Sequence, residues 1–356
     1  MAKRQIHIGQ VLMPPAIFTG LFLALWCYKC IMLVLFQNAI IYNPFLPPNA
    51  RSMRISDFSR QCGGIEWREG RIKSLDGTEI ALCISEMFCE HKPNGSPKTP
   101  VYILYFQGNA SSLPPRLPDI SGIMRQLKAE TEGPVHYTIV CLSYRGYWTS
   151  HDRPSEKGID LDSEAALRWI AKLHQDRYKQ TEGTVPNPIT ILWGQSIGCG
   201  LATNLAAKTQ NAATLPINAL ILETPFTNTR AMLTALYPQK WLPYRHLWPF
   251  LRNHLDSWSN LGTIATKASK PGVYIVEGGK DELVPSDHGS TLYKRCQEVQ
   301  LFAELHTVRG ALHNDVMVRK EGKHTIARSI ALAVSRAQEA YADQKPSLRG
   351  PSKSKN

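Results

Sequence analysis

Residues 189–200 read I-T-I-L-W-G-Q-S-I-G-C-G, and this stretch decides the fold. Its first part is a run of β-branched and large apolar residues that predicts a buried strand, and the apolar residues after Gly198 recur at helical spacing. A strand that turns into a helix through G-x-S-x-G forces the central residue, Ser196, into a strained backbone conformation. The flanking Gly194 and Gly198 have no Cβ that could collide with the neighbouring elements. The turn would lift the Ser196 hydroxyl off the sheet, at a helix N-terminus that favours developing negative charge.

Strands and helices alternate on both sides of this stretch. The dipeptide Asp76-Gly77 predicts a hairpin turn, because apolar residues alternate after it at Ile80, Leu82 and Ile84. Further along the chain, buried-strand patterns occupy residues 101–106, 137–142, 219–222, 273–276 and 301–306, and helical patterns occupy residues 119–130, 162–177 and 325–340. Such alternation predicts a mostly parallel sheet with helices on both faces, which binds ligands at the carboxyl ends of its strands.

A serine hydroxyl needs a base to remove its proton and a third group to orient that base. In this kind of sheet the partners follow the serine in the order Asp or Glu, then His, each after a later strand. The strand at 273–276 runs into E-G-G-K-D-E-L-V-P, which offers Asp281, and the strand at 301–306 runs into T-V-R-G-A-L-H-N-D, which offers His313. The sequence therefore predicts a catalytic triad of Ser196, Asp281 and His313.

Other residues compete for these roles on weaker grounds. His306 falls inside a predicted strand and His288 in the helix expected after Asp281, so both histidines are interpreted as structural. Glu282 and Asp287 lie past the strand end, and Asp315 follows the base too closely to orient it.

Acyl transfer also needs donors for the oxyanion of the tetrahedral intermediate. One is expected from the backbone N–H of Ile197, directly after the nucleophile, and the other from the loop after the strand at 101–106. This loop reads Q-G-N-A-S-S, and Gly108 lets the chain approach closely, so the N–H of Asn109 is the second candidate. A plain surface turn is the alternative for this loop.

Composition and charge restrict the functional classes. The chain has 356 residues and a net charge of +12, of which residues 1–60 carry +5 and the tail from Asp343 carries +3. Because the excess lies in the flanks, we expect no nucleic-acid groove, and basic flanks suit an anionic membrane surface. Cys27 and Cys30 have C-x-x-C spacing without a second pair, so no metal and no cofactor are expected there, whereas palmitoylation stays open.

An apolar run of 21 residues at 16–36 contains a single charge, Lys29. At about 1.5 Å per residue it spans roughly 30 Å, the thickness of a bilayer core. A cleaved signal peptide would have a shorter apolar core and a small-x-small site, and neither is seen. We therefore expect an uncleaved single-pass anchor, in the endoplasmic reticulum or, since no acidic residue precedes Asp57, in a mitochondrial membrane. Topology and oligomeric state stay open.

These patterns divide the chain into five parts. We expect a basic segment at 1–15, a transmembrane anchor at 16–42, a Pro-rich linker at 43–60, the α/β domain at 61–342 and a disordered basic tail at 343–356. Within the domain, residues 224–262 form a candidate lid. Its stretch 237–258 holds six aromatic residues, Tyr237, Trp241, Tyr244, Trp248, Phe250 and Trp258, interleaved with Lys240, Arg245 and Arg252.

The ordered motifs F-Q-G-N-A-S-S, S-Y-R-G-Y, W-G-Q-S-I-G-C-G, G-G-K-D-E-L-V-P and G-A-L-H-N-D together resemble those of the membrane-anchored α/β-hydrolases of the bud-emergence group. The likeness extends over residues 65–341 and is nearest to abhydrolase-domain lipases that act on lysophosphatidylserine and monoacylglycerol. It implies an α/β-hydrolase fold, the Ser196, Asp281, His313 triad and an oxyanion hole from Asn109 and Ile197. In two places the chain departs from the family pattern: Gln107 stands where the family usually has histidine, and Trp148 where it tends to have a second glycine.

Three functions compete on this evidence. The leading hypothesis is a membrane-tethered serine hydrolase that cleaves a lipid carboxylic ester of lysophospholipid or monoacylglycerol type, since an aromatic, basic lid beside an anchor suits an acyl ester with an anionic head group. The rings of the lid could instead only pack the insertion onto the domain. A thioesterase that removes acyl groups from proteins would use the same residues. A non-catalytic membrane scaffold is kept open by Gln107 and Trp148.

Overall fold

The computed structural model describes residues 8–89, 98–110, 112–179, 185–209, 215–240 and 242–343. Its centre is an eight-stranded sheet in the order β1-β2-β4-β3-β5-β6-β7-β8. The strands are β1 (Arg68–Lys73), β2 (Glu79–Cys89), β3 (Thr99–Phe106), β4 (Val135–Leu142), β5 (Ile189–Gln195), β6 (Ile217–Glu223), β7 (Gly272–Gly278) and β8 (Ala303–Val308). Strands β3 to β8 run parallel, and β2 is antiparallel to both β1 and β4. The predicted α/β-hydrolase sheet is therefore confirmed.

The predicted hairpin at Asp76-Gly77 joins β1 to β2. The Ser74 N–H donates to the Thr78 carbonyl at 2.8 Å, and Gly77 has φ +87°, a conformation that glycine adopts without a steric penalty. Large apolar residues alternate along the first half of β2, but neither face of the strand is exposed to solvent there, because the core covers both. Ile80, Leu82 and Ile84 point into one half of the core, and Ala81 and Cys83 into the other.

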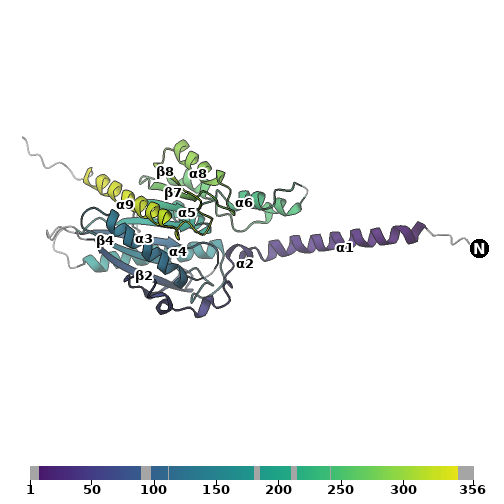
Figure 1. Cartoon of the computed structure of the whole chain (residues 1–356), viewed down its shortest axis with the longest axis horizontal. Helices are drawn as coiled ribbons and strands as arrows, with labels where there is room; N and C mark the ends of the chain where they lie inside the picture. Colours follow the sequence, from purple (N-terminus) through teal and green to yellow (C-terminus); the bar gives the residue numbers. More distant parts are fainter. Residues whose placement is uncertain are drawn as a thin grey trace, which may run out of the picture.

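Helices cover both faces of the sheet (Figure 1). One face carries α3 (Leu117–Glu130) and α9 (Lys320–Asp343), and the other carries α4 (Glu156–Tyr178), α5 (Ile197–Lys208), α7 (Ser257–Ala265) and α8 (Asp287–Glu298). Successive residues of β5 enter opposite halves of the core: Leu192 packs under α5, whereas Ile191 and Trp193 pack under α9. A strand buried on both faces reads as a continuous apolar run, which is why residues 189–193 show no alternation.

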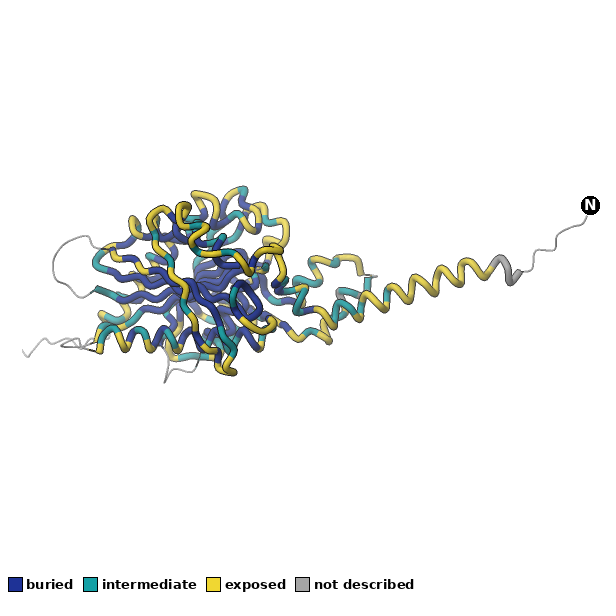
Figure 2. Tube along the Cα trace, turned by 90° about the horizontal axis from the view of Figure 1, so that it is seen from below, coloured by how far each residue is buried: buried dark blue, intermediate teal, exposed yellow. Residues whose placement is uncertain are grey.

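The N-terminal helix α1 (Ile8–Leu35) projects away from the domain and is exposed along most of its length (Figures 1 and 2). Its residues 12–35 have a mean hydropathy of 2.0 and are long and apolar enough to cross a membrane. A short helix, α2 (Gln37–Tyr42), continues it to the domain. Residues 1–7 and 344–356, which hold part of the expected basic segment and nearly all of the expected tail, lie outside the described residues.

The expected Pro-rich linker at 43–60 is folded onto the domain instead. It contains two short 3₁₀ helices, η1 (Ala50–Ser52) and η2 (Ile55–Phe58), and Ala50 is buried. Arg51 donates to the Ser150 carbonyl at 2.7 Å, and the Trp148 indole N–H donates to the Met53 carbonyl at 2.8 Å. A chain segment with these side-chain contacts is part of the domain surface and does not act as a free spacer.

The candidate lid at 224–262 proves shorter than expected at its C-terminal end. Helix α7 begins at Ser257, and its Leu261 and Ile264 are buried in the core, so this helix belongs to the layer that covers the sheet. What stands away from the sheet is α6 (Thr229–Leu236) with η4 (Pro243–His246) and η5 (Trp248–Phe250), beside the base of α1 (Figure 1). We call residues 229–251 the lid segment. Trp241 and the side chain of Arg245 lie outside the described residues.

The helix expected at 162–177 begins earlier, at Glu156. Its N-cap is Ser155, whose side chain accepts a hydrogen bond from the Gly158 N–H, so the start of the helix is set by a serine. Asp162, which the sequence placed in the first turn, lies in the second turn, buried against the Arg145 side chain.

Candidate active site

Ser196 sits in the strained turn that the motif predicts, with φ 52° and ψ −117° between β5 and α5. Both flanking glycines are needed in this geometry. A Cβ on Gly194 would lie 2.4 Å from the Gly198 carbonyl oxygen, and a Cβ on Gly198 would lie 2.2 Å from the Phe106 carbonyl oxygen at the end of β3. No rotamer change relieves a clash with backbone, so the close approach of β3, β5 and α5 depends on these two positions.

The fold brings Ser196, His313 and Asp281 together from three strand ends. His313 follows β8, Asp281 follows β7, and both lie beyond the carboxyl edge of the sheet. The His313 Nε2 atom lies 2.9 Å from the Ser196 hydroxyl oxygen, and the Nδ1 atom lies 2.7 Å from the Asp281 Oδ2 atom. A carboxylate facing Nδ1 selects the tautomer with the proton on Nδ1, which leaves Nε2 to accept the serine proton.

Asp281 is held as an anion by several donors. Its Oδ1 atom accepts the backbone N–H groups of Leu283 at 2.9 Å and Val284 at 2.8 Å. Burial by itself would raise the pKa of Asp281, but the hydrogen bonds from His313 and from these two backbone groups outweigh it and keep the pKa below its usual value. Glu282, the weaker candidate, accepts the His313 backbone N–H at 3.0 Å and so positions the loop that carries the base.

The competing histidines lie elsewhere. His288 is buried in α8, and its Nδ1 atom lies 3.0 Å from the Thr227 hydroxyl. His306 lies on β8, where its Nε2 atom meets the Glu304 carboxylate at 2.9 Å. Asp315 pairs with Arg319 and accepts the Leu312 N–H. Each of these groups has a partner that accounts for it structurally.

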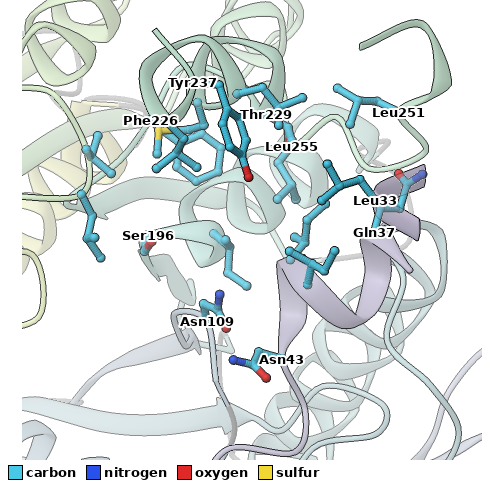
Figure 3. Close-up of a pocket in the computed structure, with 18 of the residues that line it drawn as sticks. Leu33, Gln37, Asn43, Asn109, Ser196, Phe226, Thr229, Tyr237, Leu251 and Leu255 are labelled. Atoms are coloured by element: carbon cyan, nitrogen blue, oxygen red, sulfur yellow. The ribbon is translucent and has the colours of Figure 1, made fainter. Parts of the chain in front are cut away.

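The two expected oxyanion donors are at the same end of the site. Ile197 is the first residue of α5, so its N–H belongs to the unpaired donors of a helix N-terminus. Asn109 lines the cavity beside Ser196 and Ile197, and Figure 3 shows Asn109 and Ser196 at the same end of it. The loop of Asn109 is held by the Tyr144 hydroxyl, which donates to the Gln107 carbonyl at 2.7 Å, and by Arg116, which donates to the Asn109 carbonyl at 3.4 Å.

Gln107 and Trp148, the two departures from the family pattern, are both buried. Among the described residues, the Gln107 side-chain amide has no hydrogen-bond partner. Trp148 has φ +40°, so it keeps the backbone conformation that a glycine would adopt there, and its indole ring packs in the core.

One charged residue under the site was not singled out from the sequence. Glu223 ends β6 and is completely buried, with Oε2 accepting from the Trp193 indole N–H at 3.2 Å and Oε1 accepting from the Met317 N–H at 3.2 Å. Burial raises the pKa of Glu223 to about 7, although these donors oppose the shift. Glu223 thus connects β5, the strand that precedes Ser196, with the loop after His313 by hydrogen bonds. The only signal in the sequence is a lone carboxylate at the end of the apolar run 219–222.

The site opens into an apolar cavity of about 490 Å³. Ser196 and His313 line it, and its walls are mainly aliphatic and aromatic side chains from the lid segment, from residues 283–284, from the end of α1 and from α2. Figure 3 shows Leu33 of α1 and Gln37 of α2 across the cavity from Ser196. Within the described ranges, no cluster of three or more His, Cys, Asp or Glu residues has metal-binding geometry.

The chain is similar to several known proteins. It is 30% identical to protein bem46 of Schizosaccharomyces pombe over 282 residues, which cover 79% of this chain and 81% of that protein. It is 27% identical to the α/β-hydrolase domain-containing protein WAV2 of Arabidopsis thaliana over 272 residues, covering 74% and 77%, and 31% identical to human α/β-hydrolase domain-containing protein 17B over 221 residues, covering 62% and 63%. No protein-family model matches the chain.

Solved structures share the fold at low identity. The Pyrococcus furiosus esterase Pf2001 superposes with a TM-score of 0.50 at 16% identity, over 80% of this chain and 94% of the esterase. An esterase from Pyrobaculum calidifontis gives the same TM-score and identity over 80% and 90% of the two chains. At this identity the likeness establishes the fold.

Proposed function

Because the chain belongs to the bem46 group of α/β-hydrolases, we propose that it is a membrane-tethered serine hydrolase that cleaves a lipid carboxylic ester through an acyl-enzyme. One observation carries the proposal: Ser196, at the start of a hydrogen-bonded chain through His313 to Asp281, lines an apolar cavity whose opposite wall is the end of the apolar helix α1 with α2. Three aligned groups supply an activated nucleophile, and the cavity supplies room for an acyl chain.

The proposed reaction has two steps, acylation and deacylation of Ser196, and His313 transfers a proton in each. The Ser196 hydroxyl oxygen attacks the ester carbonyl carbon while His313 Nε2 takes its proton, and Asp281 stabilises the imidazolium that forms. The oxyanion lies between the backbone N–H groups of Ile197 and Asn109. His313 then protonates the departing alcohol, and the acyl group remains on Ser196. A water oxygen then attacks the acyl carbon while His313 Nε2 takes a proton from the water. His313 returns this proton to the Ser196 oxygen as the acyl–serine bond breaks and the fatty acid leaves. The reaction needs no cofactor.

The surroundings of the site favour a lipid over a small soluble ester. The cavity is mostly apolar, and it reaches the part of the chain that we propose spans the bilayer, residues 12–35. Rings of the lid segment stack on cations: Arg230 lies 3.9 Å from the centre of the Trp248 ring, and Lys29 of α1 lies 5.5 Å from the centre of the Tyr244 ring. Such pairs suit the membrane interface, where an amphipathic ring meets both tails and head groups.

The basic residues of the candidate lid leave fewer free cations for an anionic lipid head group than the sequence predicts. Arg252 does not point to an empty site, because its guanidinium donates to the Val34 and Leu35 carbonyls at the end of α1, at 3.1 Å each. The proposal is therefore an acyl ester of lysophospholipid or monoacylglycerol type, bound mainly through its acyl chain.

Labelling with a fluorophosphonate tests the nucleophile first. The full-length protein in detergent should take the label at Ser196, and the Ser196→Ala variant should take none while it unfolds at the same temperature. An unlabelled but folded wild type would contradict the proposal and favour the scaffold interpretation.

Turnover by the wild type and by Ser196→Ala then tests the substrate class. We expect 1-oleoylglycerol and an oleoyl lysophospholipid to be hydrolysed faster than an S-oleoyl peptide. Preference for the peptide would reassign the same triad to a protein thioesterase.

A further inference from the structure

One stripe of α1 is turned toward the domain, although the helix is otherwise exposed. Trp26, Cys30, Leu33 and Val34 of α1 are partly buried, as is Met32, and Gln37 at the start of α2 is buried, whereas Ile31 and Leu35 are exposed. Apart from Met32, the buried and partly buried positions fall at i, i+4, i+7, i+8 and i+11 counted from Trp26, which places them on one face of a helix. A helix that served only as a tether would show no such stripe where it leaves the domain.

This stripe continues into the catalytic cavity. Leu33, Val34, Gln37, Ile40 and Ile41 line the same cavity as Ser196 and His313, and at about 1.5 Å per residue they cover roughly 12 Å of wall. The facing wall comes from α6 of the lid segment, where Met232, Leu233 and Leu236 line the cavity. The space between α1 and α6 is therefore apolar on both sides.

Hydrogen bonds hold α2, directly after α1, against the end of the lid segment and the two residues that follow it. The Gln37 Nε2 atom donates to the Phe250 carbonyl at 3.1 Å, and its Oε1 atom accepts the Arg252 backbone N–H at 2.7 Å. The Asn253 amide, itself buried, donates to Asn38 at 2.7 Å and accepts from the Tyr42 hydroxyl at 3.1 Å. Groups separated by more than two hundred residues in the sequence thus fix the distance between the two walls.

The inner end of the wall is attached to the oxyanion loop. The Tyr42 carbonyl, the last of α2, accepts the backbone N–H of Ala110 at 3.3 Å, and it also accepts the Tyr147 hydroxyl. Ala110 directly follows Asn109. The N-terminal helices are therefore hydrogen-bonded directly to the loop that carries Asn109, and α1 is more than a tether near the site.

We propose that the end of α1 together with α2 is one wall of the acyl-binding site, and that the acyl chain of a bilayer lipid reaches Ser196 by passing between α1 and α6. This inference rests on the proposed function and adds the route and the binding residues to it. Two features point to a chain that comes from the bilayer: the wall continues an apolar helix that is long enough to cross a membrane, and Ser196 lies across the cavity from this helix (Figure 3).

Two leucines of α1 offer a matched pair for the test. Leu33 lines the cavity, and Leu35 is exposed on nearly the opposite face, since two residues correspond to about 200° of helical rotation. The full-length protein and its Leu33→Trp and Leu35→Trp variants would be reconstituted in phosphatidylcholine nanodiscs. Each would be assayed with 1-oleoylglycerol in the bilayer and with 4-nitrophenyl acetate in solution.

Obstruction of the acyl route has a distinctive signature. We expect Leu33→Trp to lower kcat/KM for 1-oleoylglycerol at least tenfold more than it lowers kcat/KM for 4-nitrophenyl acetate, while Ser196 still takes the fluorophosphonate label. Leu35→Trp should change neither substrate. A milder variant, Leu33→Ala, removes contact with the acyl chain without adding bulk, and should lower kcat/KM for the long-chain ester at least threefold.

Equal long-chain activity of the Leu33 and Leu35 variants would overturn the inference, and so would a Leu33→Trp variant that loses both substrates equally while Leu33→Ala behaves like wild type. A failure of the proposed function is distinguishable, because the wild type itself would then hydrolyse neither ester and take no label.

Discussion

The buried ion pair between Arg145 and Asp162 offers the sharpest test of what holds the loop beside the site. Arg145 lies in the S-Y-R-G-Y loop and is 4% exposed, and Asp162 is completely buried. The guanidinium contacts both carboxylate oxygens of Asp162, at 2.7 and 3.1 Å, and also binds Asp76 at 2.9 Å. We predict that Arg145→Met leaves the Asp162 carboxylate buried without its cation.

Removing one member of a buried pair costs about 3–5 kcal/mol, because the remaining charge stays desolvated. At about 2 °C per kcal/mol for a domain of this size, the Tm of the detergent-solubilised variant should fall by roughly 6–10 °C. The measurement is thermal unfolding followed by tryptophan fluorescence. The matched control is Arg168→Met, which removes an exposed pair with Glu164 on α4 and should lower Tm by about 1 °C or less.

The loss should depend on pH in a defined direction. Burial raises the pKa of Asp162 above its usual value even though Arg145 opposes the shift, and the variant lacks that opposition. When a carboxyl group has a higher pKa in the folded state than in the unfolded state, the free energy of unfolding of the protein falls as the pH rises from the unfolded pKa toward the folded pKa. The Tm deficit of Arg145→Met should therefore be small near pH 4 and grow toward neutral pH.

A double variant, Arg145→Met with Asp162→Leu, should recover most of the lost Tm, because it removes the buried charge together with its partner. The reasoning is refuted if Arg145→Met stays within 2 °C of the Arg168→Met control at pH 7, or if its deficit shrinks as the pH rises.

Three further predictions concern the site. Gly198→Ala places a Cβ 2.2 Å from the Phe106 carbonyl oxygen and should abolish ester hydrolysis and fluorophosphonate labelling, because α5 must move away from β3. Gln107→Met replaces a buried amide that lacks a partner among the described residues and should raise the free energy of unfolding by about 1 kcal/mol, measured by urea unfolding. Asp281→Asn should lower kcat for a soluble ester by about 10³–10⁴-fold through the wrong histidine tautomer, whereas Glu282→Gln, which keeps an acceptor for the backbone, should lower it less than about threefold.

Each of these has a control or a contrary result. Gly262→Ala meets only the end of the flexible Arg295 side chain and should keep full activity, so equal loss in both glycine variants would contradict the steric argument. A lower free energy of unfolding for Gln107→Met would mean that the amide has a partner in solution. A larger effect of Glu282→Gln than of Asp281→Asn would exchange the roles of the two acids.

Local signals in the sequence predict the fold class and the candidate triad. A glycine on either side of Ser196, between an apolar run and a helical pattern, allows one strand–turn–helix geometry, and Asp281 and His313 then follow from the order of the strand ends. Since parallel strands all end at one edge of the sheet, knowing which residues follow each strand is enough to bring the three together. The apolar helix at the N-terminus is equally readable, because length and hydropathy are local properties.

What only the tertiary structure decides is which distant groups meet. No spacing rule connects Gln37 with Arg252, Tyr42 with Ala110, or Arg145 with Asp162, since each pair is formed by side chains or backbone groups from different elements. Periodicity reports the burial of an element but not the identity of its neighbour, so the sequence predicts an anchor and a lid as separate parts. The tertiary structure joins them into the two walls of one cavity, because Gln37, directly after α1, is hydrogen-bonded to the lid segment and the same cavity contains Ser196.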